Sequence, residues 1–184
     1  MKASLLLLLI CFLSSSLLSQ KYYTKEGKIT FSSDAPLEKI EGINHKASSV
    51  IDISSGNIQW AVLIKAFQFE KALMQEHFNE NYMESSKHPK SKFKGIVSNM
   101  EEVHLDKDGS YNALVEGQLE IHGVTKDIKV QATFEVADGV IKAHSLFSVK
   151  VADYEIQIPG VVKDNIAKEV EIDISANYLL FDKS

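Results

Sequence analysis

The sequence predicts an all-β fold with one inserted α-helix. Apolar and polar residues alternate through most of the chain, which is typical of antiparallel strands that bury one face. Turn sequences separate several of these segments: SSGN at residues 54–57, DKDG at 106–109 and DG at 138–139. Only residues 70–85 repeat their apolar side chains with a helical period. Such chains form sandwiches or barrels, and the long meander strands here favour closure into a barrel.

Residues 1–19 are predicted to be a signal peptide that is cleaved off. Lys2 supplies the positive charge, residues 5–18 are mostly apolar, and Ser19 is a small residue suited to cleavage. The apolar run is shorter than the roughly 20 residues that a spanning helix needs. We therefore expect an exported protein without an integral membrane segment after cleavage.

The remaining residues, 20–184, are predicted to form a single domain held together by its hydrophobic core. The lone cysteine, Cys11, leaves with the signal peptide, and Ile10 stands before it where a lipoprotein signal carries a small residue. Without disulfides, an exported domain depends on apolar burial. The net charge of −5 disfavours nucleic acid as a partner. All 20 basic residues are lysine, so no guanidinium group is present to hold an anion by two hydrogen bonds.

Ten strands and one helix are expected. In chain order, the strands are residues 29–31, 47–53, 58–69, 93–99, 101–105, 111–121, 128–136, 140–151, 155–158 and 169–180. The helix, residues 70–85, carries Leu73, Met74, His77, Phe78 and Tyr82 on one side. That side either packs against the sheet or forms a lid over a cavity.

The alternation of side chains predicts which residues point inward. The candidates for an apolar lumen are Trp60, Val62, Ile64, Leu119, Ile121, Phe134, Phe147, Val149, Ile174 and Tyr178. Small residues share these faces: Gly117, Ala132, Ala143, Ser145 and Ala176. Large and small residues together either interlock as a solid core or leave a channel. A channel would bind an apolar chain with a gain of roughly 0.8 kcal/mol per buried methylene.

A polar head group would need polar contacts, and lysines supply the candidates. Lys90, Lys92 and Lys94 alternate along one face of a predicted strand. Thr125 and Lys126, next to the hairpin turn, are the second choice. The alternative for the three lysines is a solvated face that keeps a strand edge soluble, and Thr-Lys beside a turn is also ordinary turn chemistry.

The sequence offers no pattern of known catalytic or metal chemistry. The six histidines, at positions 45, 77, 88, 104, 122 and 144, show none of the close spacings of metal motifs, and we expect His122 and His144 to point to solvent. There is no G-x-S-x-G, no cysteine nucleophile and no glycine-rich phosphate loop. Asp153 and Tyr154 could serve as an acid–base pair, but such a pair is more typical of a turn. We expect no enzyme, no metal and no cofactor.

Three ordered segments resemble the YceI-like family. LEIHGVTK at residues 119–126 is similar to its L-x-I-x-G-V-T-K hairpin. Residues 67–82 followed by 87–95 (KHPKSKFKG) resemble its helix and next strand, and DYEIQIP at 153–159 resembles its D-Y/F-x-I segment. The resemblance implies an extended lipocalin-like antiparallel β-barrel in an exported bacterial protein, periplasmic or secreted, that binds a long isoprenoid-type lipid in its lumen.

One departure concerns the ligand. Many members carry a histidine shortly after the first strand, whereas residues 31–35 are FSSDA and the nearest histidine is His45. Our hypothesis is a carrier that sequesters an elongated apolar lipid, with a homodimer left open by the exposed strand edges. The alternatives are a closed-core structural or stress-related interaction module, and a hydrolase or isomerase acting on a lipid in the lumen.

Overall fold

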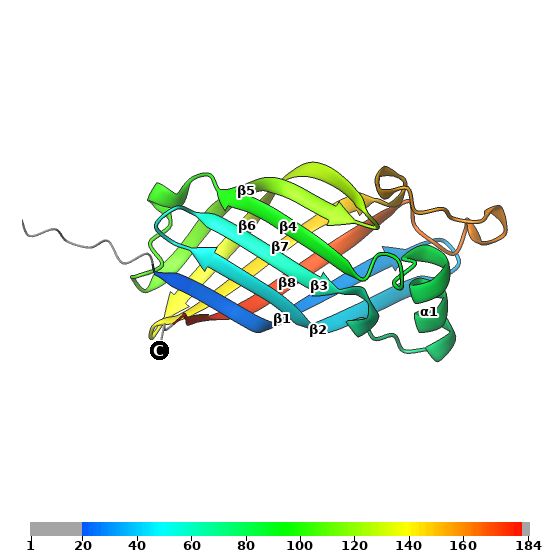
Figure 1. Ribbon diagram of the computed structural model, residues 1–184, viewed down its shortest axis with the longest axis horizontal. Helices are drawn as coiled ribbons and strands as arrows, with labels where there is room; N and C mark the ends of the chain where they lie inside the picture. Colours follow the sequence, from blue (N-terminus) through cyan, green and yellow to red (C-terminus); the bar gives the residue numbers. More distant parts are fainter. Residues whose placement is uncertain (1–19, 182–184) are drawn as a thin grey trace, which may run out of the picture.

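The computed structural model describes residues 20–181, so the predicted signal peptide lies outside the described residues. Eight antiparallel strands form a closed barrel in which each strand pairs with the next and β8 returns to β1. The strands are β1 Lys21–Asp34, β2 Lys39–Asp52, β3 Asn57–Leu63, β4 Lys90–Val97, β5 Gly109–Ile121, β6 Val124–Ala137, β7 Val140–Lys150 and β8 Glu169–Leu180 (Figure 1). The predicted fold class, an extended lipocalin-like antiparallel barrel with one inserted helix, is confirmed.

The first strand is far longer than predicted, because a bulge interrupts its alternation. The pairing of β1 with β2 shifts on both sides of Gly27. A side chain at this position would collide with the ring of Trp60, since a Cβ would lie 2.8 Å from it. The bulge and its glycine therefore make room for the indole on the inner face.

Two predicted strands are wrong. Residues 101–105 begin within a short 3-10 turn, Met100–Glu102, and their apolar members Val103 and Leu105 are buried in the core. Residues 155–158 lie in the irregular connection between β7 and β8. In both places, apolar residues cover an end of the barrel without joining the hydrogen-bonded ladder, and periodicity cannot distinguish these two uses.

The third strand is also shorter than predicted. β3 ends at Leu63, and the chain turns through a 3-10 helix, Ile64–Ala66. The fully buried Asn44 holds this turn, because its side-chain amide donates to the carbonyl oxygen of Leu63 at 2.9 Å. The turn redirects the chain away from the sheet and toward the end of the barrel.

The predicted helix is divided into an α-helix, α1 (Ala72–His77), and a π-helical turn, Phe78–Tyr82. Both lie at one end of the barrel, the α1 end, together with the connection between β7 and β8, while the last residues of β8 lie at the opposite end (Figure 1). Phe78 anchors the segment, with its ring centroid 5.2 Å from Phe31, 5.5 Å from Phe67 and 4.9 Å from Phe69.

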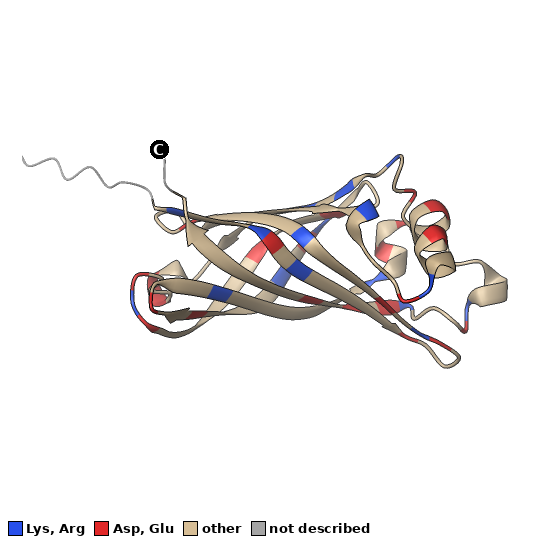
Figure 2. Ribbon diagram, turned by 90° about the horizontal axis from the view of Figure 1, so that it is seen from below, with Lys and Arg blue, Asp and Glu red and all other residues tan. Residues whose placement is uncertain are grey.

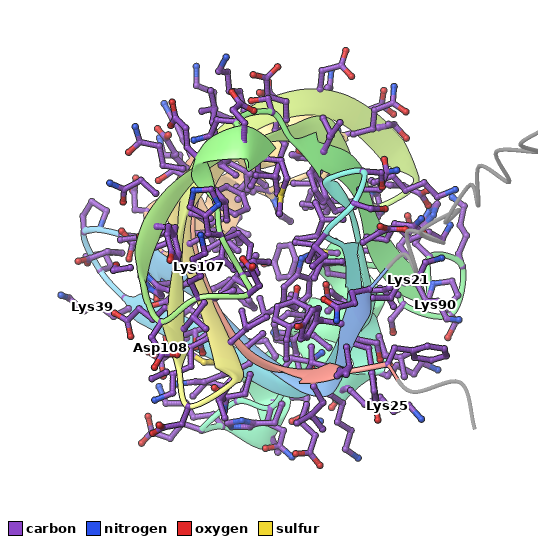
Figure 3. The ribbon with its side chains drawn as sticks, turned by 90° about the vertical axis from the view of Figure 1, so that its left-hand side faces the viewer. Lys21, Lys25, Lys39, Lys90, Lys107 and Asp108 are labelled. Atoms are coloured by element: carbon purple, nitrogen blue, oxygen red, sulfur yellow. The ribbon has the colours of Figure 1, made fainter. Side chains whose placement is uncertain are left out.

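The solid part of the core fills the end opposite α1. Its largest fully buried side chains include Tyr178, Phe134, Ile51 and Ile141. Charged residues are spread along the strands and over α1 (Figure 2). Seen along the barrel axis, Lys25, Lys39 and Lys90 project outward (Figure 3). Among the described residues, no helix is long and apolar enough to cross a membrane.

The wall of the barrel is incompletely paired between β6 and β7. Their ladder runs from Ala137 and Val140 to Ala132 and Ser145 and ends there. Residues 124–131 of β6 therefore pair only with β5, and residues 146–150 of β7 pair only with β8. We call this unpaired stretch the β6–β7 seam. A 3-10 turn, Val151–Tyr154, contacts both strands at the end of the seam.

Candidate functional site

A cavity of about 350 Å³ occupies the barrel interior toward the α1 end. This volume is within the range of small-molecule sites, about 300–1,000 Å³. Its wall is almost entirely apolar side chains from the strands, from the α1 segment and from the β7–β8 connection. The apolar faces of the strands thus look onto a space and not only onto one another.

All ten residues predicted to line an apolar lumen lie on this wall. They are Trp60, Val62, Ile64, Leu119, Ile121, Phe134, Phe147, Val149, Ile174 and Tyr178. The small residues Ala132, Ala143 and Ser145 also line it and leave room that larger side chains would fill. Contact between these residues and a ligand stays a prediction.

The helical segment forms a lid over the cavity, since Met74, Phe78, Tyr82 and Met83 all line it. Burial raises the pKa of the Tyr82 phenol, so this hydroxyl stays neutral at physiological pH. The lid adds thioether and aromatic surface to the aliphatic wall of the strands, a combination that adapts to irregular apolar shapes. Of the two roles considered for this helix, covering a cavity is the one that the structure shows.

Two aromatic side chains form the floor of the cavity, and the hydroxyl of one of them begins a chain of two hydrogen bonds. The rings of Trp60 and Tyr178 meet edge to face, with centroids 6.4 Å apart. The Tyr178 phenol lies 2.6 Å from the hydroxyl of Ser49, which donates to the carbonyl oxygen of Gln59 at 2.8 Å. Ser49 has a single proton, so Tyr178 must be the donor to Ser49. Burial raises the pKa of Tyr178 far above its ordinary value, although the hydrogen bond to Ser49 acts in the opposite direction.

The sequence model of the YceI-like domain family matches residues 21–178, which is nearly the whole described chain. The chain belongs to the YceI-like family. Comparison with curated proteins found no match.

Solved structures confirm the YceI-like fold. A polyisoprenoid binding domain from Saccharophagus degradans implicated in plant cell wall breakdown aligns with a TM-score of 0.75 at 14% identity, covering 89% of this chain and 99% of that one. BcnA of Burkholderia cenocepacia aligns with a TM-score of 0.69 at 16% identity, covering 83% and 96%. A YceI protein of Campylobacter jejuni aligns with a TM-score of 0.53 at 20% identity, covering 77% and 85%.

In this YceI-like barrel, several polar groups line the cavity, and those at the α1 end come from the segments that connect the strands. Glu38 joins three segments, because its carboxylate lies 3.5 Å from the ammonium of Lys71 and accepts from the Asn165 amide at 3.3 Å. Glu38, Asn165 and the nearby His77 also line the cavity. We call Glu38, His77 and Asn165 the polar rim. Sequence reasoning missed it, because these residues come from separate loops and helices with no shared spacing.

The lysines predicted to contact a head group lie on the outside of the barrel. Lys90, Lys92 and Lys94 are exposed, while Phe93 between them points inward and is buried. The ammonium of Lys92 lies 3.2 Å from the Glu120 carboxylate.

Thr125 and Lys126 are exposed at the start of β6. Lys92 is nevertheless among the residues that line the cavity, whereas Lys90, Lys94, Thr125 and Lys126 are not, and the head-group role stays a prediction for all five.

The prediction that His122 points to solvent is wrong. Only 12% of its side chain is exposed, and its Nδ1 and Nε2 lie 3.2 Å from the Tyr154 carbonyl oxygen and 3.0 Å from Glu84 Oε2. Strand alternation does not extend to His122, because it forms the turn between β5 and β6 with a positive φ of 53°. His144, by contrast, is exposed on β7 as expected. The hydrogen bond to His122 and the charge of Lys87 lower the pKa of Glu84.

Proposed function

We propose that this protein sequesters or carries an elongated apolar ligand, an isoprenoid-type lipid, in the lumen of its barrel. The observation that carries the proposal is the cavity of about 350 Å³ with an almost wholly apolar wall. A prenyl chain offers only apolar surface, and its burial gains roughly 0.8 kcal/mol per methylene-sized group. No polar partner is needed along the chain, which fits a wall built from aliphatic and aromatic side chains.

The orientation of the ligand follows from where the polar groups lie. The closed end of the lumen holds Trp60 and Tyr178, and the Tyr178 hydroxyl is already hydrogen-bonded to Ser49. The polar rim lies at the α1 end, where Glu38 and Asn165 can exchange hydrogen bonds with a hydroxyl group. The apolar tail therefore extends toward Tyr178, and the polar end of the lipid remains near the rim.

The relatives support the class of ligand. One solved structure of this fold is a polyisoprenoid binding domain, and its similarity covers 89% of this chain. Together with the apolar N-terminal segment, the family also supports export to the periplasm or the exterior of a bacterial cell. We include export in the proposal.

The alternatives fit the structure less well. A closed-core interaction module would bury its apolar faces against one another, whereas these faces surround a cavity. For a hydrolase or isomerase that used the predicted pair Asp153 and Tyr154, the pKa of Tyr154 is raised by burial and by Asp153, so this phenol is a poor proton donor or acceptor near neutral pH. We propose binding without chemical turnover.

Trp60 provides the experiment. It is the only tryptophan in the sequence and lines the cavity, so its fluorescence reports on the lumen without a label. Titration of the delipidated protein with all-trans geranylgeraniol should change the emission in a saturable way at one equivalent. A fluorescent prenol analogue should still bind to Trp60→Phe without the intrinsic signal. An emission spectrum that stays unchanged up to the solubility limit of the lipid would contradict the proposal.

A further inference from the structure

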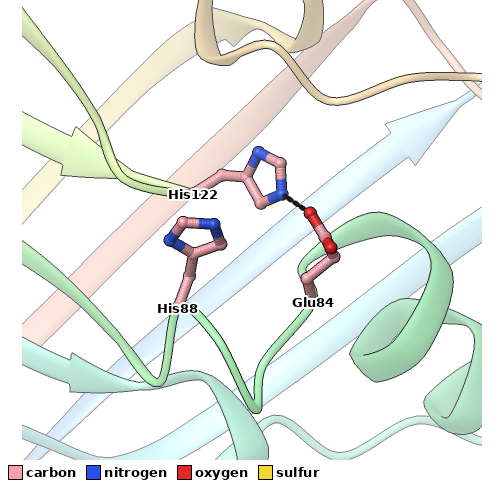
Figure 4. Close-up of side chains that lie close together, drawn as sticks. All are labelled: Glu84, His88 and His122. Atoms are coloured by element: carbon pink, nitrogen blue, oxygen red, sulfur yellow. Dashed lines mark hydrogen bonds and ion pairs between the residues drawn. The ribbon is translucent and has the colours of Figure 1, made fainter.

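Beside the lid, outside the lumen, three potential metal ligands converge from separate segments. Glu84 follows the π-helical turn, His88 precedes β4, and His122 lies at the tip of the β5–β6 hairpin (Figure 4). One ligand atom of each lies within 4.8 Å of those of the other two. We propose that Glu84, His88 and His122 bind one Zn²⁺ ion, with water as the fourth ligand. This site is independent of the proposed lipid.

The donor set and its spacing fit zinc. Two imidazoles and one carboxylate are donors that Zn²⁺ prefers, whereas Mg²⁺ and Ca²⁺ favour oxygen ligands alone. Tetrahedral bonds of about 2.0–2.1 Å hold neighbouring ligand atoms about 3.3 Å apart. Glu84 Oε2 and His122 Nε2 are 3.0 Å apart and already match one edge of that tetrahedron. A ring nitrogen of His88 lies within 4.8 Å of both atoms and must come closer to complete it.

The hydrogen bonds of His122 leave Nε2 available to a cation. The Tyr154 carbonyl oxygen, 3.2 Å from Nδ1, can only accept, so Nδ1 carries a proton. In the neutral ring, Nε2 then directs a lone pair at the Glu84 carboxylate, which is also an acceptor. A proton or a metal ion must therefore lie between these two acceptors. A ligating histidine whose other nitrogen donates to a backbone carbonyl is the usual arrangement in zinc sites.

The backbone and its packing fix the positions of the ligands. Glu84 and His122 have φ angles of 40° and 53°, in the left-handed region that non-glycine residues rarely adopt. A turn of this kind normally carries Asn-Gly, and here it carries His-Gly. The ring of His88 lies directly on the turn, since a Cβ at Gly123 would come 2.7 Å from it. Glu84 and His122 thus adopt backbone conformations that their residue types alone do not favour.

The surroundings allow an ion to enter. Glu84 is 44% exposed, so one side of the cluster is open to water. The nearest opposing charge is Lys87, whose ammonium lies 3.8 Å from the Glu84 carboxylate, and this side chain is 69% exposed and can swing away. An ion here would join the lid segment to the β5–β6 hairpin and, through Tyr154, to the β7–β8 connection.

Zinc titration of the chelator-treated protein, produced without a polyhistidine tag, tests the site. Competition with a chromophoric chelator should show one equivalent of Zn²⁺. His88→Gln, Glu84→Gln and His122→Asn should each weaken it by at least about tenfold. Asparagine at position 122 is compatible with the left-handed turn. His144→Gln is the matched control, because His144 also lies 3.3 Å from a carboxylate, that of Asp173, with no third ligand among the described residues.

Spectroscopy separates a metal site from a merely structural cluster. Co²⁺ bound in place of zinc should give the visible bands of a tetrahedral complex, and these should disappear in His88→Gln while the circular dichroism spectrum is unchanged. The proposal is overturned if wild type binds less than one equivalent, or if His88→Gln binds as tightly as wild type. Either result would assign the charge between Glu84 and His122 to a proton.

Discussion

The phenol oxygen of Tyr178 lies 2.6 Å from the hydroxyl oxygen of Ser49, deep inside the barrel. Tyr178 belongs to β8 and Ser49 to β2, which are separated in the sheet by β1. This contact therefore joins two strands that share no backbone hydrogen bonds. It also closes the end of the cavity.

Breaking this contact should destabilise the barrel by different amounts, depending on which of its two residues is replaced. In Tyr178→Phe, the Ser49 hydroxyl still donates to Gln59, so we expect a loss of about 0.5–1.5 kcal/mol in the free energy of unfolding. In Ser49→Ala, the buried Tyr178 hydroxyl loses its acceptor, and we expect about 1–3 kcal/mol. Urea unfolding measures both. An equal or smaller loss in Ser49→Ala would contradict the assigned direction of the hydrogen bonds.

The same tyrosine predicts a dependence on alkaline pH. Its folded-state pKa is raised above the value of about 10 in the unfolded chain, so its stabilising contribution is full below pH 10 and is lost as the pH rises. Above that pH, the free energy of unfolding of wild type should fall by about 1.4 kcal/mol per pH unit relative to that of Tyr178→Phe. A constant difference between pH 9 and pH 11, roughly one unit either side of that pKa, would show that Tyr178 ionises in the folded protein.

Filling the lumen should abolish lipid binding without unfolding the barrel. Val130 lines the cavity, whereas its neighbour Gln131 is exposed on the outer face. Val130→Trp should weaken the binding of geranylgeraniol by at least about tenfold, the loss expected when an apolar pocket no longer fits its ligand. Gln131→Trp, with the same added volume on the other face, should bind like wild type. Equal affinities in a radiolabelled lipid assay would place the ligand elsewhere.

The β6–β7 seam should control how fast the lipid exchanges. Gln131 and Leu146 follow directly after the last bridged pair, Ala132 and Ser145, and no cysteine is present in the described residues. A disulfide in Gln131→Cys/Leu146→Cys should close the seam and slow lipid transfer to acceptor vesicles, and reduction should restore it.

Glu135→Cys/Lys142→Cys is the matched control for the seam, because these residues already face each other in the paired part of the ladder. Its disulfide should leave the rate of transfer unchanged. Equal slowing by both disulfides would show that general rigidity, and not the seam, limits exchange.

The strands from β5 onward were predictable because their alternation is uninterrupted. Tyr111 to Ile121 forms most of β5, and residues 128–136 lie within β6 with inward faces as expected. The long β1 was not predictable, because the bulge at Gly27 shifts the alternation partway along the strand. Val103 and Leu105 resemble a strand in sequence but cover the core from a turn. The local sequence pattern shows how buried residues are spaced, but it does not show which parts of the fold bury them.

The candidate site divides in the same way. The lumen wall follows from parity, so all ten predicted residues reach the cavity. The polar rim depends on loops that meet only after the barrel closes. The burial of the His122 side chain depends on a left-handed backbone at a position where alternation ends. Hydrogen bonds between distant loops leave no spacing in the sequence, and neither set could be found without the fold.

Native mass spectrometry of the protein, purified from its own host without detergent, tests the central claim most directly. Organic extraction of the same sample would identify any bound molecule. The lumen predicts a one-to-one adduct with the mass of a prenyl lipid, which should be absent from Val130→Trp purified in parallel. A bare protein mass that stays unchanged after incubation with prenyl lipids would contradict the carrier function and favour a closed-core module.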